Sequence, residues 1–281
     1  MPLTDSEIKQ LQQHARQLRL DIIDTTVWAG GAHIGGSLSM AEILVLLYFK
    51  VMKIDPKRPD WTERDRLVLS KGHGGVGLAS VLAQRGYYSK ELLREFNHFN
   101  SPFGMHLDGN KVIGVDASTG SLGHGLPMAL GMAMGARHQG QAWRSYCILG
   151  DGECNEGSIW EAAMAAAHFK VSNLTAFLDR NRLMMDGDTE EIMALEPLAD
   201  KWRAFGWVPL EVDGHDLQAL AGALEMAHAE KSAPTIIIAR TTKGKGVDFM
   251  ENDVKWHYGS FDSELAKRAR ASVEKLYEGV L

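Results

Sequence analysis

A Gly-Asp-Gly turn at residues 150–152 ends one apolar run, and Asn181 ends another, 30 residues after Asp151. The first run covers residues 146–149, and a helical stretch then leads to the second run at 173–178. Two parallel strands joined by a crossover helix place their C-terminal ends side by side, which is where open α/β sheets bind ligands. We therefore expect Asp151 and Asn181 to share one edge of a parallel sheet.

The residue types at this edge suit a hard cation. A carboxylate, an amide oxygen and phosphate oxygens form an all-oxygen ligand set, which Mg²⁺ and Ca²⁺ prefer. Gly152 lets the backbone approach a phosphate without a Cβ in the way. A Gly-Asp-Gly sequence alone is equally typical of a turn, so the ligand interpretation depends on Asn181 and on two later carboxylates, Glu156 and Glu161.

Length and composition favour an α/β protein with one domain. The chain has 281 residues, 45% of them hydrophobic, which is enough for a sizeable core. Expected strands at 66–70, 207–212 and 235–239 alternate with helical stretches, so we predict a mostly parallel sheet with helices on both faces. No flexible Gly/Ser linker divides the chain, and we predict a single domain over residues 1–281.

Several functional classes are disfavoured. The net charge of −6 and the pI near 6.0 argue against a nucleic-acid partner. Two cysteines cannot make a disulfide framework, and Cys147 lies in an apolar strand where we expect a buried thiol. The longest apolar stretch, residues 43–49, is too short to span a membrane, and no signal peptide opens the chain. We expect a cytoplasmic protein with no membrane partner.

A glycine motif at residues 72–77 fits Gly-x-Gly-x-x-Gly after a plausible strand, but this pattern is weak as a dinucleotide signature. A dinucleotide site also needs an acidic strand end about 20 residues further on. The acidic residues there, Glu91 and Glu95, fall within an expected helix. We therefore reject the dinucleotide-binding interpretation.

Four of the 11 histidines lie beside glycine or in irregular segments: His33, His73, His106 and His257. Loops carry function more often than helix faces do, and an imidazole can donate or accept a proton near neutral pH. Each of them alone is more often structural or solvated. Zinc is a rival interpretation for clustered histidines, but the chain lacks the local Cys/His and His-Glu-x-x-His spacings of common zinc sites.

With these motifs in order, the chain resembles the transketolase family from about residue 16 to 260. The resemblance implies a thiamine diphosphate-binding α/β fold, the diphosphate domain of that family. It implies thiamine diphosphate as cofactor, with Mg²⁺, Ca²⁺ or Mn²⁺. The implied metal ligands are the side chains of Asp151 and Asn181 and the main-chain carbonyl of Leu183.

The resemblance also implies contacts to the cofactor. His73 would hydrogen-bond a diphosphate oxygen, Gly120 would contact the aminopyrimidine, and Leu122 would help to hold it over the thiazolium. The other implied cofactor-binding residues are Ser121, Gly152, Glu153, Asn181 and His257. The family usually has Pro where Ser121 stands, and Ser121 can also serve as the N-cap of the helix expected at 122–137.

For catalysis, the resemblance implies that His33, His106 and His257 contact ketose hydroxyls and shuttle protons. Glu156 and Glu161 would join a proton network across a subunit interface, although surface charge is the alternative for both.

Two features of the sequence stay open at this stage. Arg180 departs from the Asn or Asp that commonly precedes the metal-binding Asn, a departure that removes no expected ligand. The glycine-rich turn at 243–246 carries two lysines that could clamp a phosphate or could be solvated.

Transketolases have three regions, and the resemblance covers the first of them. We expect the pyrimidine-binding and C-terminal domains to be absent from this chain, and in the family the former supplies the glutamate that activates the cofactor. We therefore expect the N-terminal subunit of a split transketolase, active only with a C-terminal partner subunit in an α₂β₂ assembly. The expected reaction moves a two-carbon ketol unit from a ketose (phosphate) to an aldose (phosphate), but the sequence does not identify the sugars.

Three alternatives remain. Two are enzymes, a 1-deoxy-xylulose-5-phosphate synthase relative and an α-subunit of a 2-oxo acid dehydrogenase. The segments 104–106 and 256–259, Gly-Met-His and Trp-His-Tyr-Gly, favour transketolase over both. The third is a non-catalytic homologue that binds a partner, which the intact Asp151, Asn181 and four histidines argue against.

Overall fold

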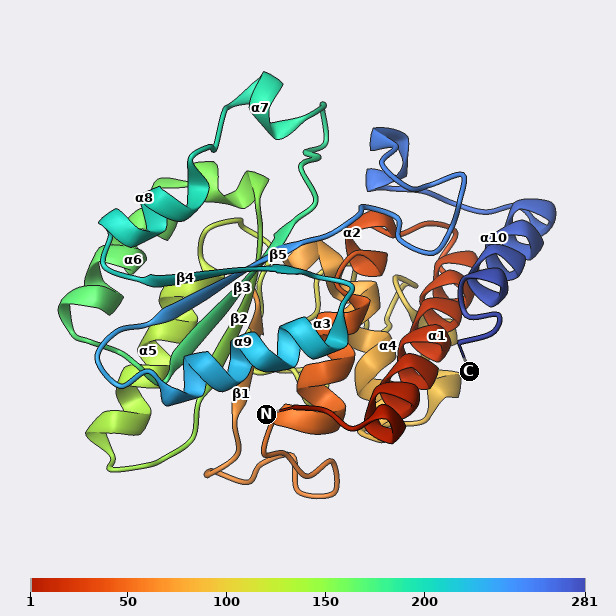
Figure 1. Ribbon diagram of the computed structural model, residues 1–281. Coiled ribbons are helices and arrows are strands. Elements are labelled where there is room, and N and C mark those ends of the chain that lie inside the picture. The colour runs from red at the N-terminus through yellow and green to blue at the C-terminus, as the bar shows by residue number, and fades with distance from the viewer. Residues whose placement is uncertain (1, 281) are drawn as a thin grey trace.

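Five parallel strands form one sheet at the centre of the part of the chain that the computed structural model describes, residues 2–280 (Figure 1). The spatial order is β1-β2-β3-β5-β4, and every neighbouring pair is parallel. The bounds are Arg66–Leu69 (β1), Ser145–Gly150 (β2), Leu174–Arg180 (β3), Val208–Asp213 (β4) and Thr235–Arg240 (β5). The prediction of a mostly parallel α/β sheet is confirmed, and the central strand β3 is buried along its whole length, as strands covered on both faces are.

Helices cover both faces because alternate strand residues point to opposite sides. Tyr146 and Ile148 of β2 belong to the core under α1, α3, α4 and α9, whereas Cys147 and Leu149 belong to the core under α5, α6 and α8. The helices are α1 (Asp5–Trp28), α2 (Gly35–Leu38), α3 (Ala41–Leu46), α4 (Gly75–Arg85), α5 (Gly125–His138), α6 (Gly157–His168), α7 (Thr189–Ile192), α8 (Leu198–Ala204), α9 (Leu217–Ala229) and α10 (Ser263–Leu276).

Short 3₁₀ or π turns connect several elements. They are η1 (Leu47–Val51), η2 (Gly72–Gly74), η3 (Lys90–Glu95), η4 (Gly152–Asn155) and η5 (Val254–His257). Glu91 and Glu95 lie in η3 and are exposed, so no acidic strand end follows the glycines at 72–77. No helix within residues 2–280 is both long and apolar enough to cross a membrane.

One expected helix boundary was wrong. Helix α5 begins at Gly125 with His124 as its N-cap, so Ser121 does not cap it. The backbone N–H of Gly123 donates to the Glu153 carboxylate over 2.9 Å, and Gly123 adopts a φ of +84°. A positive φ is not compatible with a right-handed helix, so α5 begins only at Gly125.

The sheet register brings the functional loops together. Gly150 of β2 pairs with Asp179 of β3, so Asp151 and Asn181 leave adjacent strands at the same edge. The loops after β1 and β5 leave from that edge as well, because all the strands run in parallel. The C-terminal edge of the sheet is therefore where a site can form.

Candidate active site

A cavity of about 350 Å³ opens at the C-terminal edge of the sheet. It is lined by residues from the loops after β1, β2, β3 and β5 and from the start of α2. The sequence-predicted residues on its wall are His33, His73, Gly120, Leu122, Asp151, Gly152, Glu153, Glu156, Asn181, Leu183 and His257. Residues from six separate parts of the chain thus meet in one place.

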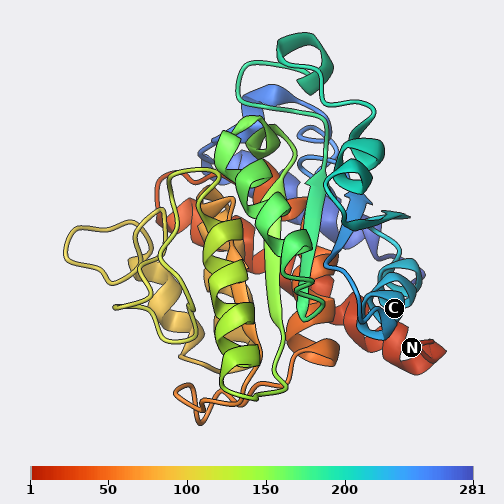
Figure 2. The same ribbon diagram turned by 90° about the vertical axis from the view of Figure 1, so that its left-hand side faces the viewer.

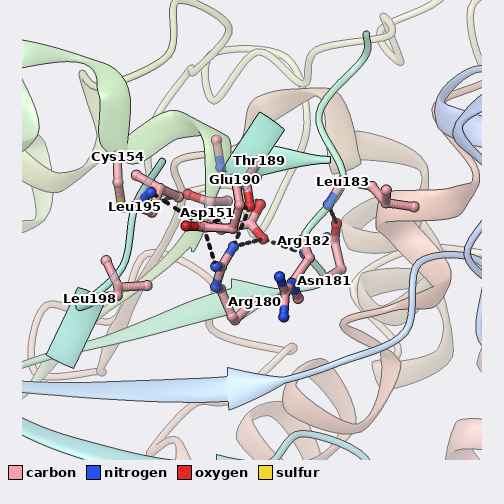
Figure 3. Close-up of polar contacts among 12 residues, drawn as sticks. Asp151, Cys154, Arg180, Asn181, Arg182, Leu183, Thr189, Glu190, Leu195 and Leu198 are labelled. Carbon is pink, nitrogen blue, oxygen red and sulfur yellow. Dashed lines mark hydrogen bonds and ion pairs between the residues drawn. The ribbon is translucent and has the colours of Figure 1, made fainter. Parts of the chain in front are cut away.

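Asp151 is buried where β2 ends, with 2% of its surface exposed. Its Oδ1 accepts the N–H of Gly152 at 2.8 Å, and its Oδ2 accepts the N–H of Arg182 at 2.6 Å. The Arg180 guanidinium also reaches Oδ2, at 3.2 Å (Figure 3). Burial, together with the nearby charge of Asp179, raises the pKa of Asp151 above its ordinary value.

Asn181 and Leu183 complete an oxygen cluster with Asp151. The Asn181 amide oxygen accepts the N–H of Leu183 at 3.1 Å, while its amide nitrogen donates to Asp179 at 3.2 Å. Asp151, Asn181 and Leu183 all line the cavity, and the Leu183 carbonyl accepts from Nζ of Lys243 at 2.8 Å. A carboxylate, an amide and a carbonyl oxygen make a donor set that fits a hard divalent cation.

The same wall has room for phosphate oxygens. Glycines at positions 36, 120, 150 and 152 line the cavity. A Cβ on Gly152 would come within 2.9 Å of the Met184 side chain, so a larger residue would crowd this wall. Within residues 2–280, no three His, Cys, Asp or Glu side chains are placed to hold a metal. The oxygen cluster contains one such side chain, so oxygens from a bound phosphate are needed to complete a cation's coordination.

A buried ion pair that sequence reasoning missed lies behind the oxygen cluster. Lys71 pairs with Asp179 and also donates to the carbonyl of Gly36. Burial opposes ionisation of Asp179, but the Lys71 ammonium and its hydrogen bonds outweigh burial and lower the pKa of Asp179. Two features of the sequence pointed to this pair. Lys71 directly precedes Gly-His, and Asp179 lies within an apolar strand two residues before Asn181. The pair fixes the loop after β1 against the end of β3.

Lys243 is the member of the glycine-rich turn that reaches the cavity. Its Nζ donates to the carbonyl of Leu183 at 2.8 Å and to Nδ1 of His257 at 2.9 Å. Burial, with the charge of Lys71, lowers the pKa of Lys243 to about 8. Lys245 instead pairs with Glu251 at 3.4 Å. A clamp made by both lysines is therefore not formed.

Four histidines gather on the other side of the cavity and form a histidine cluster, His33, His73, His106 and His257. The ring centroids of His33 and His73 lie 5.4 Å apart, those of His33 and His257 also 5.4 Å, and those of His33 and His106 6.2 Å. His73 and His257 stack with centroids 5.3 Å apart. Segments separated by more than 200 residues in sequence thus bring these imidazoles into mutual contact.

Three members of the histidine cluster, His33, His73 and His257, are electrically neutral near pH 7. Burial lowers the pKa of His33 to about 4, that of His257 to about 3 and that of His73 to about 2. The charges of Lys71 and Lys243 act in the same direction on His73 and His257. The buried Nδ1 of His33 has no hydrogen-bond partner among residues 2–280.

Glu153, a predicted cofactor-binding residue, is buried and hydrogen-bonded to other parts of the protein. Its carboxylate accepts from the Ser70 hydroxyl, from the N–H of Gly123 at 2.9 Å and from the N–H of Gly150 at 3.0 Å. Both oxygens are therefore occupied by protein donors. Glu153 ties the loop that carries Gly120 and Leu122 to the end of β2, at the wall of the cavity.

Other predicted residues lie at the rim or beyond it. Glu156 is the exposed N-cap of α6 and lies on the cavity wall. Ser121 and Glu161 are exposed and are not part of that wall, and His106 reaches the site from its mouth, also exposed. On this chain alone, Glu161 faces solvent.

Residues 9–273 match the transketolase thiamine diphosphate-binding domain, which is nearly the whole chain. The chain belongs to the transketolase family. It is 44% identical over 265 residues to the 6-deoxy-6-sulfo-D-fructose transketolase subunit SqwG of Clostridium sp. (strain MSTE9), covering 94% of this chain and 96% of the relative. It is 39% identical over 272 residues to an apulose-4-phosphate transketolase subunit of Phocaeicola vulgatus, covering 97% and 96%.

Longer transketolases match over their diphosphate-binding part. The human transketolase is 35% identical over 278 residues, covering 98% of this chain and 43% of the human protein. The crystal structure of the Campylobacter jejuni transketolase superposes with a TM-score of 0.88 and 33% identity, covering 94% of this chain and 42% of that one. This chain therefore spans less than half the length of these transketolases.

These similarities confirm the predicted fold, enzyme class and cofactor. The protein is a transketolase subunit of the N-terminal, thiamine diphosphate-binding type, and it belongs with enzymes that transfer ketol groups using thiamine diphosphate and a divalent metal. Three relatives matched over at least 90% of their own length are named as transketolase subunits, in line with the subunit expected from the sequence.

Proposed function

We propose that this transketolase subunit transfers two-carbon ketol units between sugar phosphates in an α₂β₂ complex with a C-terminal partner subunit. The observation that supports this most is the meeting of the oxygen cluster and the histidine cluster at one cavity. The names of the relatives, which are subunits of split transketolases, support the need for a partner. The chain would form one domain over residues 1–281 and act in the cytoplasm, where its two buried free cysteines stay reduced.

We assign the oxygen cluster to the divalent cation. The Asp151 carboxylate, the Asn181 amide oxygen and the Leu183 carbonyl would hold it, with the cofactor's phosphate oxygens as further ligands. His73, Gly152 and Lys243 would contact the diphosphate, and Gly120 and Leu122 would contact the rings. The bound cofactor supplies the chemistry that breaks and forms the carbon–carbon bond, and the protein supplies orientation and charge.

We assign proton transfer to the histidine cluster. His33, His106 and His257 would face the sugar hydroxyls. Neutral imidazoles can accept a hydroxyl proton and return it, and depressed pKa values keep His33 and His257 neutral over the physiological range. His33 and His257 line the cavity, so their rings can exchange a hydrogen bond with a bound sugar.

We also propose that α5 and α6 contribute to a subunit interface. They lie side by side on the face shown in Figure 2. Met128 and Met164 project from this face with 40% and 54% of their surfaces exposed. A Cβ added at Gly131 or Gly135 would meet no atom within 4 Å, so another chain can approach the backbone closely there. Glu156 and Glu161 would then lie near the contact and join a proton network between subunits.

The proposal is tested by reconstitution. The chain and its C-terminal partner are purified separately, then assayed alone and mixed with thiamine diphosphate and Mg²⁺ on ketose phosphates. The panel includes 6-deoxy-6-sulfo-D-fructose, because one relative is a transketolase subunit for that sugar. Activity should need both chains, and light scattering should show two copies of each. Ketol transfer by this chain alone would refute the need for a partner.

A further inference from the structure

Arg180, the last residue of β3, connects Asp151 to three residues of the later segment 182–196. Its guanidinium is buried, with 5% exposed. Nη1 donates to Asp151 at 3.2 Å and to the Thr189 hydroxyl at 2.6 Å. Nη2 donates to Glu190 at 2.7 Å and to Glu196 at 2.9 Å. Figure 3 shows the guanidinium between Asp151 and the chain that carries Thr189 and Glu190.

Three of these four partners belong to the segment 182–196, which forms one wall of the cavity. Leu183, Met184, Met185 and Asp186 of this segment line the cavity. Much of the segment gains little from apolar burial, since Met185 and Met193 are 59% and 60% exposed. A short segment with little buried surface depends on polar anchors to keep its position.

Many of the segment's other hydrogen bonds are internal. The N–H of Thr189 donates to the carbonyl of Arg182, and the N–H groups of Leu195 and Glu196 donate to the Glu190 carboxylate at 3.2 and 3.3 Å. Glu190 therefore holds the far half of the segment together, and Arg180 holds Glu190 to the end of β3. Two further hydrogen bonds hold the segment: Lys201 donates to the carbonyl of Leu195, and Lys243 donates to the carbonyl of Leu183.

We propose that Arg180 is a positioning residue that fastens the 182–196 segment beside Asp151, so that the carboxylate and the Leu183 carbonyl are presented together to the divalent cation. This inference rests on the proposed function. The shortest bonds of the guanidinium go to the segment, and Glu190 and Glu196 balance its charge. Arg180 is therefore an anchor for the segment rather than a substitute for the cation at Asp151.

Removing the guanidinium would leave Asp151, Glu190 and Glu196 near one another without a cation between them. Asp151 is buried, so its carboxylate without a cationic partner is costly, and its repulsion of Glu190 and Glu196 would push the segment outward. Partners that orient a metal ligand typically change metal affinity by about 10- to 100-fold when lost. Lysine would keep the charge but cannot bond Asp151 and both glutamates at once.

The first experiment measures hydrogen exchange of the chain without cofactor in wild type, Arg180→Gln, Arg180→Lys and Arg203→Gln. Arg203 is the matched control, since it pairs with Asp200 on the exposed side of α8. Arg180→Gln should speed exchange across 189–196 by about tenfold, with Leu217–Ala229 unchanged as the internal reference. Arg180→Lys should fall between, and Arg203→Gln should match wild type. Wild-type exchange in Arg180→Gln would overturn the inference.

The second experiment separates positioning from simple structural support. Tryptophan fluorescence follows thiamine diphosphate binding while Mg²⁺ is varied. The half-saturating Mg²⁺ concentration should rise about tenfold in Arg180→Gln, recover in part in Arg180→Lys and stay unchanged in Arg203→Gln. Faster exchange with unchanged Mg²⁺ dependence would assign Arg180 a purely structural role and overturn the inference. Absence of cofactor binding by the wild-type complex reconstituted with its partner subunit would instead refute the proposed function.

A further variant applies if Arg180→Gln fails to fold. The double variant Thr189→Val/Glu196→Ala removes two partners of the guanidinium and leaves Arg180 and Asp151 in place. It should raise both exchange in the segment and the Mg²⁺ requirement, in the same direction as Arg180→Gln. Wild-type values for either quantity in this double variant would overturn the inference.

Discussion

The oxygen cluster and the histidine cluster face one cavity but are built differently. Asp151 and Asn181 directly follow β2 and β3, are 2% and 8% exposed, and are hydrogen-bonded to fixed neighbours. His33 and His106 come from irregular segments, and their rings are held 6.2 Å apart only by the packing of those segments. One cluster is positioned by sheet register, the other by loops.

This difference suits two different tasks. A cation and a diphosphate that stay bound through many turnovers need ligands fixed by rigid elements. Substrates that enter and leave at each turnover are served by residues on loops at the mouth of a site. Variants in the oxygen cluster should therefore change cofactor binding, and variants at the mouth of the histidine cluster should change turnover.

The largest effect is expected for Asp151→Ala. Without its carboxylate the divalent ion cannot neutralise the diphosphate, so cofactor-dependent activity and Mg²⁺-dependent binding should both be lost. Asn181→Ala should weaken binding less, because an amide oxygen carries no formal charge. Asp213→Ala is the matched control, an aspartate at the end of the edge strand β4, and should bind as wild type. Titration calorimetry with thiamine diphosphate measures all three, and wild-type affinity in Asp151→Ala would remove the oxygen cluster from the site.

His33→Ala and His106→Ala should lower kcat of the reconstituted enzyme by about 100-fold, the usual loss when a general acid or base is removed. Affinity for thiamine diphosphate should stay within about twofold of wild type, since these residues face the sugar. Steady-state kinetics and cofactor titration on the same preparations test this division. An equal loss of cofactor affinity in both variants would contradict the claim that these two histidines act on the sugar and not on cofactor binding.

His73→Ala should raise the apparent Kd for thiamine diphosphate by about tenfold, the loss of one hydrogen bond to a charged oxygen. His73 therefore differs from the other members of the histidine cluster. Its loss should weaken cofactor binding, as loss of an oxygen-cluster residue should. Fluorescence titration at saturating Mg²⁺ measures the change. Unaltered affinity together with lowered kcat would move His73 to the substrate side.

The smallest effect is expected in the pH dependence of stability. Burial lowers the pKa of His73 to about 2 from an ordinary value of 6.5, so at mildly acidic pH the unfolded chain takes up a proton that the folded chain does not. Stability from this residue is fully present above about pH 6.5 and is lost as pH falls, by on the order of 2 kcal/mol at about pH 5. Urea unfolding of the cofactor-free chain at several pH values should show a shallower loss in His73→Gln than in wild type. Parallel curves would contradict the burial of a neutral imidazole.

The same contrast explains what the sequence predicted. Two apolar runs end in Gly-Asp-Gly and at Asn181, and a helical stretch joins them. Parallel strands joined in this way end at the same edge of a sheet, so the position of Asp151 at that edge could be predicted. The meeting of His33 with His257 follows from packing over more than 200 residues, and local patterns indicated only that each lies in a loop. The histidines were grouped through family resemblance, not through spacing.

Other features could not be predicted because their partners are distant. The Lys71–Asp179 pair joins two strand ends 108 residues apart, and neither residue alone signals an ion pair. Ser121 was expected as an N-cap because serine favours that position, but the Gly123–Glu153 hydrogen bond moves the helix start to Gly125. Arg180 could be recognised as a departure from the family pattern, but three of its four partners come from the folded 182–196 segment.

Magnesium dependence of cofactor binding tests the central claim most directly. Wild-type chain is titrated with thiamine diphosphate in a calorimeter, once with excess Mg²⁺ and once with a chelator. The oxygen cluster predicts binding that is at least about tenfold tighter with Mg²⁺, since the ion joins the Asp151 carboxylate to the diphosphate. Equal affinity under both conditions would contradict the assignment of Asp151, Asn181 and Leu183 to the cation.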